Sequence, residues 1–211
     1  MSGPFDERYY RKALYRERPN SSRNRRRLAE VVRLKPSGGR LLEVGCAEGG
    51  FLSLAAAHFD VRGIDASEYA ARVVRERFGL PAEAGDIGSV ALPASAFDAI
   101  VAFNLLEHLA DPEAVAARLF GALRPGGVLI GSVPNAGGIV GRPAAFVGSR
   151  LDRSHRSVFR PDAWRRIFAS AGFGPVRFFG ELNFGRNRSV YIRRAAWRHL
   201  AIALVFVCEK W

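Results

Sequence analysis

Glycines and carboxylates with a spacing that suits nucleotide binding occur early in the sequence. Gly45, Gly49 and Gly50 follow the short apolar run of residues 41–44, and an apolar helical pattern begins at residue 51. A strand, a glycine loop and a helix form the opening unit of nucleotide-binding α/β folds. Glycine reaches backbone angles that other residues avoid, and it lets a ligand lie against the main chain. The start of the helix would add unpaired N–H groups and a positive dipole end, which suit a carboxylate or a phosphate.

The loop sequence fits two kinds of ligand. Gly45-x-Ala47-x-x-Gly50 resembles a dinucleotide fingerprint, whereas Glu43-x-Gly45-x-Ala47-x-Gly49 resembles the first motif of class I S-adenosylmethionine-dependent methyltransferases. Each match has alanine where a glycine is usual. The acid two residues before the first glycine favours the second interpretation.

Two aspartates follow later apolar runs and could read the rest of a nucleoside. Asp65 lies twenty residues after Gly45, where a carboxylate can accept hydrogen bonds from both ribose hydroxyls. Asp86 follows a short third strand and could read the exocyclic amine of adenine, with Ile87 packed on the adenine face. The alternative for Asp86 is a loop aspartate that caps a turn.

The pattern of elements predicts an α/β fold with a doubly wound, mostly parallel sheet. Apolar runs alternate with helical patterns through the first two thirds of the chain, which is typical of a parallel sheet covered on both faces. Two further strands near the end bring the expected total to seven. The predicted strands are residues 40–44, 61–64, 82–84, 98–103, 128–133, 175–182 and 201–209, and the predicted helices include residues 50–59, 67–78 and 161–171 and one capped at Asp111.

The N-terminal residues 1–36 are predicted to form a helical lid over a domain of residues 37–211. An amphipathic helix is expected within residues 5–18, and Ser21 or Ser22 can cap a second helix that runs to about residue 34. Tyr9 and Tyr10 lie in the first helix and could close over the site. Residues near 134–160 are rich in Gly, Arg and Ser, and they are expected to form a loop insertion.

Several stretches taken together resemble one enzyme family. They are EVGCAEGG, GIDAS, AGDI, FDAIVAFNLLEHLADP and LRPGGVLIGSVPN, and they occur in order between residues 40 and 135. This set resembles the class I methyltransferases of the type 11/12/23 group, which is similar to the ubiquinone-biosynthesis O-methyltransferases. The resemblance implies a Rossmann-like methyltransferase fold, S-adenosylmethionine as cofactor and S-adenosylhomocysteine as product.

The resemblance also implies a role for each residue of the cofactor site. Asp65 would hold the ribose with Ala66 beside it, and Asp86 and Ile87 would hold the adenine. Asn104 would place its backbone by the methionine moiety. The residues that would line the methionine end are Glu43, Gly45, Cys46, Ala47 and Gly49.

A second stretch narrows the expected acceptor. LDRSHRSVF at residues 151–159, followed by PDAWRRIFASAGF, resembles a segment of bacterial methyltransferases that act on sugars, glycan precursors or secondary metabolites. We therefore expect a small-molecule acceptor, which could be anionic, and methylation at oxygen. Catalysis then requires the methyl group in line with the nucleophile, and an oxygen nucleophile also calls for a base.

Three residues are candidates for that base. His155 follows the fifth strand, on the side expected for the acceptor, and histidine titrates near neutrality. His108 and Glu107 follow the fourth strand and are alternatives. Glu107 could instead anchor the cofactor loop, and each histidine could instead only stabilise its own loop or helix. His58 and His199 are interpreted as structural.

Composition and charge limit the partners, metal content and location that we expect. The chain has 211 residues, and its formal net charge of +12 comes almost entirely from arginine. This charge could attract an anionic partner, or it could be spread over solvated faces. Two cysteines make neither a disulfide framework nor a metal cluster, so no metal is expected. No apolar run reaches membrane-spanning length and no secretory signal is visible, so the expected location is cytoplasmic, as a monomer or homodimer.

Two other functions remain as alternatives. A nucleic-acid-directed methyltransferase could use the arginine-rich surface. However, strand four ends in Asn-Leu-Leu-Glu rather than an Asn/Asp-Pro-Pro-aromatic motif, and aromatic residues are not interleaved with the basic runs. We therefore expect no specific binding of nucleic acid. A dehydrogenase would leave the LRPGGVL stretch and Asp86 unexplained.

Overall fold

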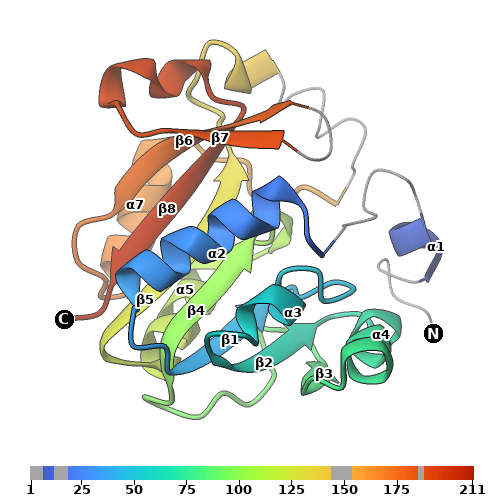
Figure 1. The fold of residues 1–211 in the computed structure, drawn as a ribbon. Coiled ribbons are helices and arrows are strands. Elements are labelled where there is room, and N and C mark those ends of the chain that lie inside the picture. Colours follow the sequence, from blue (N-terminus) through green and yellow to red (C-terminus); the bar gives the residue numbers. More distant parts are fainter. Residues whose placement is uncertain (1–6, 12–18, 144–153, 185–187) are drawn as a thin grey trace.

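The computed structural model describes the whole chain except residues 1–6, 12–18, 144–153 and 185–187 (Figure 1). One eight-stranded sheet crosses the molecule, and helices cover both of its faces. The elements in chain order are α1 (Glu7–Arg11), α2 (Ser22–Leu34), β1 (Arg40–Val44), α3 (Leu52–Ala55), β2 (Asp60–Asp65), α4 (Glu68–Phe78), β3 (Ala82–Ala84), β4 (Phe97–Phe103), η1 (Leu106–His108), α5 (Pro112–Ala122), β5 (Leu123–Pro134), α7 (Pro161–Ser170), β6 (Arg177–Phe184), β7 (Arg188–Ile192), η2 (Ala195–Leu200) and β8 (Ala203–Glu209).

The strand order is β3-β2-β1-β4-β5-β8-β6-β7, and β1 to β5 pair in parallel. β8 runs antiparallel to both β5 and β6, and β6 and β7 form an antiparallel hairpin. The order reverses between β1 and β4. In a doubly wound sheet, a ligand binds outside the carboxyl ends of the strands at such a reversal. The topology therefore places the site where the glycine loop after β1 meets the end of β4.

The predicted fold class is confirmed, but the predicted strand count of seven is wrong. The additional strand is β7, at the edge of the sheet. Its residues do not show the pattern of apolar positions that predicts a strand, because Ser189 is buried while Val190 is 44% exposed. Polar residues that face inward next to an exposed apolar residue invert the usual alternation.

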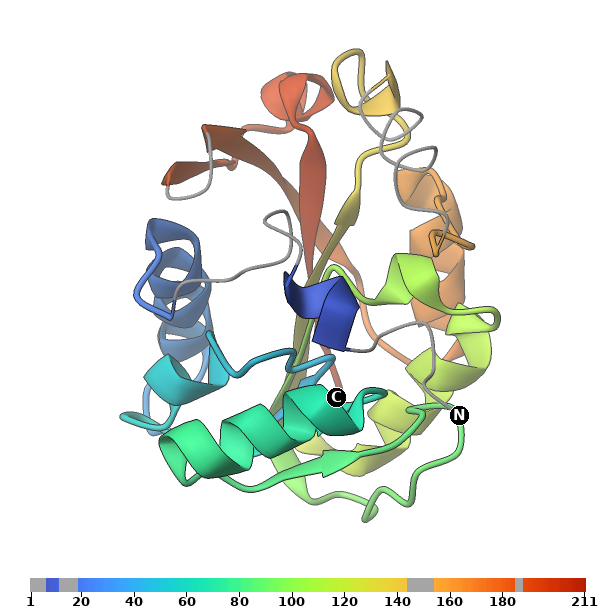
Figure 2. The same ribbon diagram turned by 90° about the vertical axis from the view of Figure 1, so that its right-hand side faces the viewer.

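Two apolar layers hold the helices to the sheet. On one face, Val31 of α2, Leu52 of α3 and Val74 of α4 pack against the strands. On the other face, α5 and α7 cover the sheet, and Trp164 and Phe168 are fully buried there. Figure 2 shows α1 in front of the sheet, between α2 on one side and η1 on the other.

Local sequence signals fix the ends of the helices. The Ser21 hydroxyl accepts from the Asn24 N–H and caps α2, as predicted. Asp111 caps α5 in the same way, with Pro112 in the first turn. Among the described residues, no helix is long and apolar enough to cross a membrane.

Candidate cofactor and acceptor site

The loop after β1 folds back on β2. The N–H groups of Gly45 and Cys46 both donate to the Ile64 carbonyl, at 2.8 and 3.1 Å. Gly45 and Gly49 have positive φ angles of 72° and 76°. Ala47 has a φ of 46°, a left-handed conformation that costs an L-residue roughly 1–2 kcal/mol. Alanine is therefore accepted at this position with some strain.

Asp65 stabilises that conformation from the end of β2. Its Oδ2 accepts from the Ala47 N–H at 2.8 Å, and its Oδ1 accepts from the Ser67 N–H at 2.9 Å. Burial raises the pKa of Asp65, against the effect of these donors. The Asp65 carboxylate therefore joins the glycine loop to the start of α4.

The Tyr10 side chain provides a test of whether Asp65 fits a ribose. The Tyr10 hydroxyl of α1 donates to Asp65 Oδ1 at 3.0 Å, and its ring stacks on Tyr69 of α4 with centroids 6.2 Å apart. A neutral hydroxyl from α1 thus already binds the Asp65 carboxylate. Ribose hydroxyls have the same hydrogen-bonding chemistry, so Asp65 fits the expected group.

The helix behind the loop is shorter than predicted. The sequence predicted residues 50–59, whereas α3 covers only Leu52–Ala55. Beyond it, the N–H groups of His58 and Phe59 both bond to the Ala55 carbonyl, at 2.9 and 3.0 Å, so three-residue and four-residue spacings are mixed. The predicted stretch therefore forms helical turns with irregular hydrogen bonding around a short regular helix.

The two side chains expected at the methionine end are buried. Glu43 is 5% exposed on β1, and Cys46 is 1% exposed. A Cβ on Gly63 of β2 would lie 2.8 Å from the Cys46 sulfur, so this thiol packs beneath the loop. Only the backbone of Cys46 is available to a ligand above the loop.

Ala66, expected beside the ribose, follows β2, and Asp86 and Ile87, expected at the adenine, follow β3. Ala66 is exposed immediately after Asp65. The Gly88 N–H donates to Asp86 Oδ1 at 2.9 Å, so this carboxylate caps a turn with one of its oxygens. Ile87 is 4% exposed and packs in the core beneath α5. The adenine-binding roles of Asp86 and Ile87 stay predictions, as does the place of Ala66 beside the ribose.

Asn104 turns the chain out of β4 at the strand reversal. Its φ of 53° is unusual for a non-glycine residue, although asparagine tolerates it better than most. Its Oδ1 accepts from the Ser132 hydroxyl of β5 at 2.6 Å. The side chain is thus tied to the neighbouring strand, and the Asn104 backbone lies at the mouth of the site.

The three predicted candidates for the base lie together, although His155 is far from the adjacent Glu107 and His108 in sequence. The rings of His108 and His155 are 4.7 Å apart between centroids in an edge arrangement. The Glu107 carbonyl accepts from the N–H groups of Arg156 and Ser157, at 2.8 and 2.9 Å. These two bonds clamp the 154–157 segment onto η1. We call Glu107, His108 and His155 the Glu-His-His cluster.

Ser154 and Ser157 fix the cluster further. The Ser154 hydroxyl is 2.8 Å from His108 Nδ1, and the Ser157 hydroxyl donates to the Leu109 carbonyl at 2.7 Å. One donor atom from each member of the cluster lies within 4.8 Å of the others. An imidazole pair with a carboxylate can move a proton, and these side chains are also ligand types for a divalent cation. The sequence predicted no metal, and it gave no indication that Ser154 and Ser157 would bond to this cluster and its loop.

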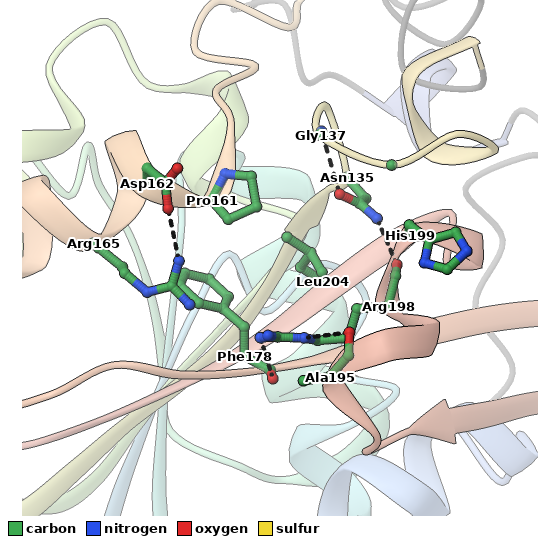
Figure 3. Close-up of a pocket in the computed structure, with 11 residues that line it drawn as sticks. Asn135, Gly137, Pro161, Asp162, Arg165, Phe178, Ala195, Arg198, His199 and Leu204 are labelled. Atoms are coloured by element: carbon green, nitrogen blue, oxygen red, sulfur yellow. Dashed lines mark hydrogen bonds and ion pairs between the residues drawn. The ribbon is translucent and has the colours of Figure 1, made fainter.

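The two histidines interpreted as structural lie elsewhere. His58 is exposed in the turn after α3. His199 is exposed on η2, at a cavity of about 210 Å³ between η2 and the start of α7 (Figure 3). Polar groups at this cavity bond to one another: Arg165 with Asp162 at 2.9 Å, and Arg198 with the Phe178 carbonyl at 3.1 Å. Phe178 and Leu204, which belong to the apolar layer under α7, line this cavity together with Asn135, which follows β5.

Comparison with known proteins agrees with this geometry. A family model described as a methyltransferase domain matches residues 10–177. The chain belongs to this methyltransferase family. The match covers the glycine loop, Asp65 and the Glu-His-His cluster. The predicted recognition as a class I S-adenosylmethionine-dependent methyltransferase is thereby confirmed, together with the enzyme class and the cofactor.

Curated relatives include ubiquinone biosynthesis O-methyltransferases. The one from Dinoroseobacter shibae is 33% identical over 155 residues, which cover 66% of this chain and 61% of the relative. A trans-aconitate 2-methyltransferase from Variovorax paradoxus is 38% identical over 106 residues, or 47% of this chain and 40% of the relative. The chain thus spans only about half the length of the curated relatives that it matches.

Solved structures share the fold. A SAM-dependent methyltransferase from Thermotoga maritima, described as a possible histamine N-methyltransferase, has a TM-score of 0.74 at 20% identity, with coverage of 97% and 94%. The magnesium protoporphyrin IX methyltransferase from Synechocystis, solved with bound SAH, has a TM-score of 0.67 at 14% identity, with coverage of 92% and 84%.

Proposed function

We propose that this protein transfers a methyl group from S-adenosylmethionine to an oxygen of a small molecule, with the Glu-His-His cluster as the source of the base. One observation carries the proposal: η1, which follows the cofactor-side strand β4, and the 154–157 segment are clamped together so that His108 and His155 are adjacent. Relatives named ubiquinone biosynthesis O-methyltransferases favour an oxygen acceptor. We further propose that residues 1–36 act as a lid, since Tyr10 of α1 contacts the ribose-side carboxylate.

The proposed reaction needs orientation more than chemical activation. The cofactor supplies an electrophilic methyl group. The protein holds the acceptor oxygen in line with that group, which is the main source of rate acceleration in such a transfer. An imidazole at His155 takes the hydroxyl proton as the oxygen attacks, and His108, bonded to Ser154, orients that ring. Glu107, buried at 2% exposure, supplies negative charge beside the imidazole that becomes protonated.

The test combines acceptor screening with one variant. Incubation with ¹³C-methyl-labelled S-adenosylmethionine and a panel of sugars, sugar nucleotides and phenols should give a methoxy carbon signal in the product spectrum. His155→Ala should lower turnover about a hundredfold, with the affinity for S-adenosylhomocysteine and the melting temperature unchanged. His58→Ala removes an exposed histidine distant from the cluster and is the control.

Two results would contradict the proposal. An N-methyl signal without any methoxy product would exclude oxygen as the acceptor atom. Turnover that survives His155→Ala, with a lower melting temperature, would leave His155 as a structural residue. Turnover after treatment with a chelator separates two uses of the cluster: a loss that added Mn²⁺ or Zn²⁺ reverses indicates a bound cation, and unchanged turnover indicates proton transfer without a metal.

A further inference from the structure

The inward face of the β6–β7 hairpin carries a group of polar residues beside a mostly apolar row. A row of paired residues crosses the sheet beneath α2 and ends at the carboxyl end of β4. The row consists of Phe179 on β6, Val205 on β8, Ser132 on β5 and Phe103 on β4. Glu181 lies two residues beyond Phe179 on the same face, and Tyr191 of β7 pairs directly with it. Ser189 is the next inward residue of β7.

Each of these three residues has one buried oxygen without a hydrogen-bond partner in the part of the chain that the structure describes, although the Tyr191 ring itself is only partly buried. Glu181 is 1% exposed and Ser189 is 2% exposed. The atoms concerned are Glu181 Oε1, Ser189 Oγ and Tyr191 Oη. A buried polar group without a partner destabilises a fold, and a cluster of them calls for an explanation. The explanation we consider is a ligand that forms the missing hydrogen bonds with these three oxygens.

One arginine forms a long ion pair with the Glu181 carboxylate, and a second lies over the neighbouring Tyr191 ring. Arg23 Nε lies 3.7 Å from Glu181 Oε1, which is longer than a hydrogen bond. The guanidinium of Arg26 lies 5.8 Å from the centre of the Tyr191 ring. Both arginines belong to α2, which runs along the sheet beside the β6–β7 hairpin (Figure 1). Their charges make this environment unfavourable for a cationic ligand, and Glu181 makes it unfavourable for an anion.

The donors and acceptors specify what kind of group would fit. A carboxylate only accepts hydrogen bonds, whereas serine and tyrosine hydroxyls both donate and accept. Burial, reinforced by the nearby Glu181 carboxylate, raises the pKa of Tyr191, so its hydroxyl keeps its proton. A neutral ligand with neighbouring hydroxyl groups can donate to Glu181 while it accepts from Tyr191 and Ser189.

We propose that Glu181, Ser189 and Tyr191 form a subsite for a hydroxylated ring, as in a sugar, at the end of the acceptor remote from the methylated atom. This rests on the proposed function. Glu181 is three strand spacings from Phe103, or about 14 Å across the sheet, so the acceptor extends over more than one ring. The Arg23 side chain is 29% exposed over a Glu181 side chain that is 2% exposed. Rotation of the long Arg23 side chain would uncover the Glu181 carboxylate for a ligand, and side-chain rotation is fast.

Ligand-observed NMR on the full chain, saturated with S-adenosylhomocysteine, tests the subsite without turnover. The probes are methyl α-D-glucopyranoside, cyclohexanol, choline and inorganic phosphate. We expect saturable binding of the glucoside and weaker or no binding of the other three. Glu181→Gln should weaken glucoside binding about tenfold or more, and Tyr191→Phe about three- to tenfold. Glu209→Gln, which alters an exposed carboxylate paired with Arg177 on the sheet, is the matched control.

The melting temperature distinguishes a ligand subsite from a structural cluster. Tyr191→Phe deletes a hydroxyl without a partner, so the melting temperature should stay the same or rise. If Glu181→Gln fails to fold, glucoside binding by Tyr191→Phe alone tests the subsite. The proposal is overturned if the glucoside does not bind, if choline or phosphate binds as well as it does, or if both variants bind it like the wild type. Saturation with S-adenosylhomocysteine is measured first, and the oxygen-methylation assay is separate, so failure of the subsite is distinct from failure of the proposed function.

Discussion

Asp65 is the residue on which the cofactor site depends most. Its carboxylate holds the Ala47 backbone and would accept from the ribose, and a hydrogen bond to a charged group contributes roughly 1.5–3 kcal/mol. Asp65→Ala should therefore lower the affinity for S-adenosylhomocysteine at least about tenfold, measured by calorimetry. Asp60→Ala removes an exposed carboxylate on the same strand and should leave the affinity unchanged. Equal affinities for both variants would place the ribose elsewhere.

Tyr10 competes for the same carboxylate. A carboxylate has about four lone-pair sites, and three hydrogen bonds to Asp65 are already present, so a ribose diol requires more acceptor capacity than remains. Tyr10→Phe should raise the affinity for S-adenosylhomocysteine, by about three- to tenfold. Tyr9→Phe, its neighbour on α1, is the control. Weaker binding by Tyr10→Phe would show instead that the hydroxyl bonds to Asp65 together with the ribose.

At the residue scale, the place of a residue in the fold could be predicted from the sequence better than the direction of its side chain. The spacing from Gly45 correctly placed Asp65 at the end of β2, whereas the position of His155 on the acceptor side stays a prediction. The adjacency of the His108 and His155 rings depends on backbone bonds between η1 and the 154–157 segment, which no local pattern encodes. The inward direction of the Cys46 thiol depends on the missing side chain at Gly63, a neighbour across the sheet.

At the scale of elements, Glu30 joins α2 to the end of β7. Its carboxylate, with a side chain 3% exposed, accepts from Arg33 at 2.7 Å and from Arg193 at 2.6 Å. Burial alone would raise the pKa of Glu30, but the hydrogen bonds from the two arginines outweigh burial and lower it. A lowered pKa in the folded state means that the stabilisation is present above the unfolded pKa, about 4.3, and is lost as the pH falls through the folded pKa.

Glu30→Gln should therefore destabilise the protein at pH 7 and have little effect in acid. Since both arginines are half-exposed, we expect a loss of about 1 kcal/mol, which lowers the melting temperature by about 2–4 °C. Thermal unfolding at pH 7 and below pH 4 measures the difference. Glu76→Gln, on the exposed face of α4, should be neutral at both values. A destabilisation that does not depend on pH would show that the charge of Glu30 is not what joins α2 to β7.

Elements with strong periodicity could be predicted, and elements defined by tertiary contacts could not. α2, α4 and α5 carry side-chain caps at Ser21, Ser67 and Asp111, so their starts are local features. β7 was missed because its inward residues are polar, and sequences depart from the usual pattern where a function requires it. The same inversion that hid the strand is the basis for the proposed subsite at Tyr191.

At the scale of the whole molecule, the arginines in the described part of the chain make ion pairs and ring contacts on several different elements. Many arginines pair with carboxylates on different elements, among them Arg40 with Asp60 on β1 and β2, and Arg75 with Glu68 on α4. Others lie over aromatic rings, as Arg27 does over Phe103 at 4.3 Å. A surface that grips a nucleic acid needs adjacent unpaired cations along one track, with aromatic side chains between them.

A measurement of binding to duplex DNA decides between a dispersed charge and a nucleic-acid partner. With a net charge of +12, the protein should bind DNA weakly at low salt, because phosphate contacts release counterions whatever the sequence. Each paired arginine adds little to such contacts, since its charge is already compensated. Fluorescence anisotropy should therefore show sequence-independent binding that disappears near physiological salt. Submicromolar affinity at that salt, or a preference for one sequence, would favour the nucleic-acid-directed methyltransferase and would make DNA rather than a sugar the acceptor to test first.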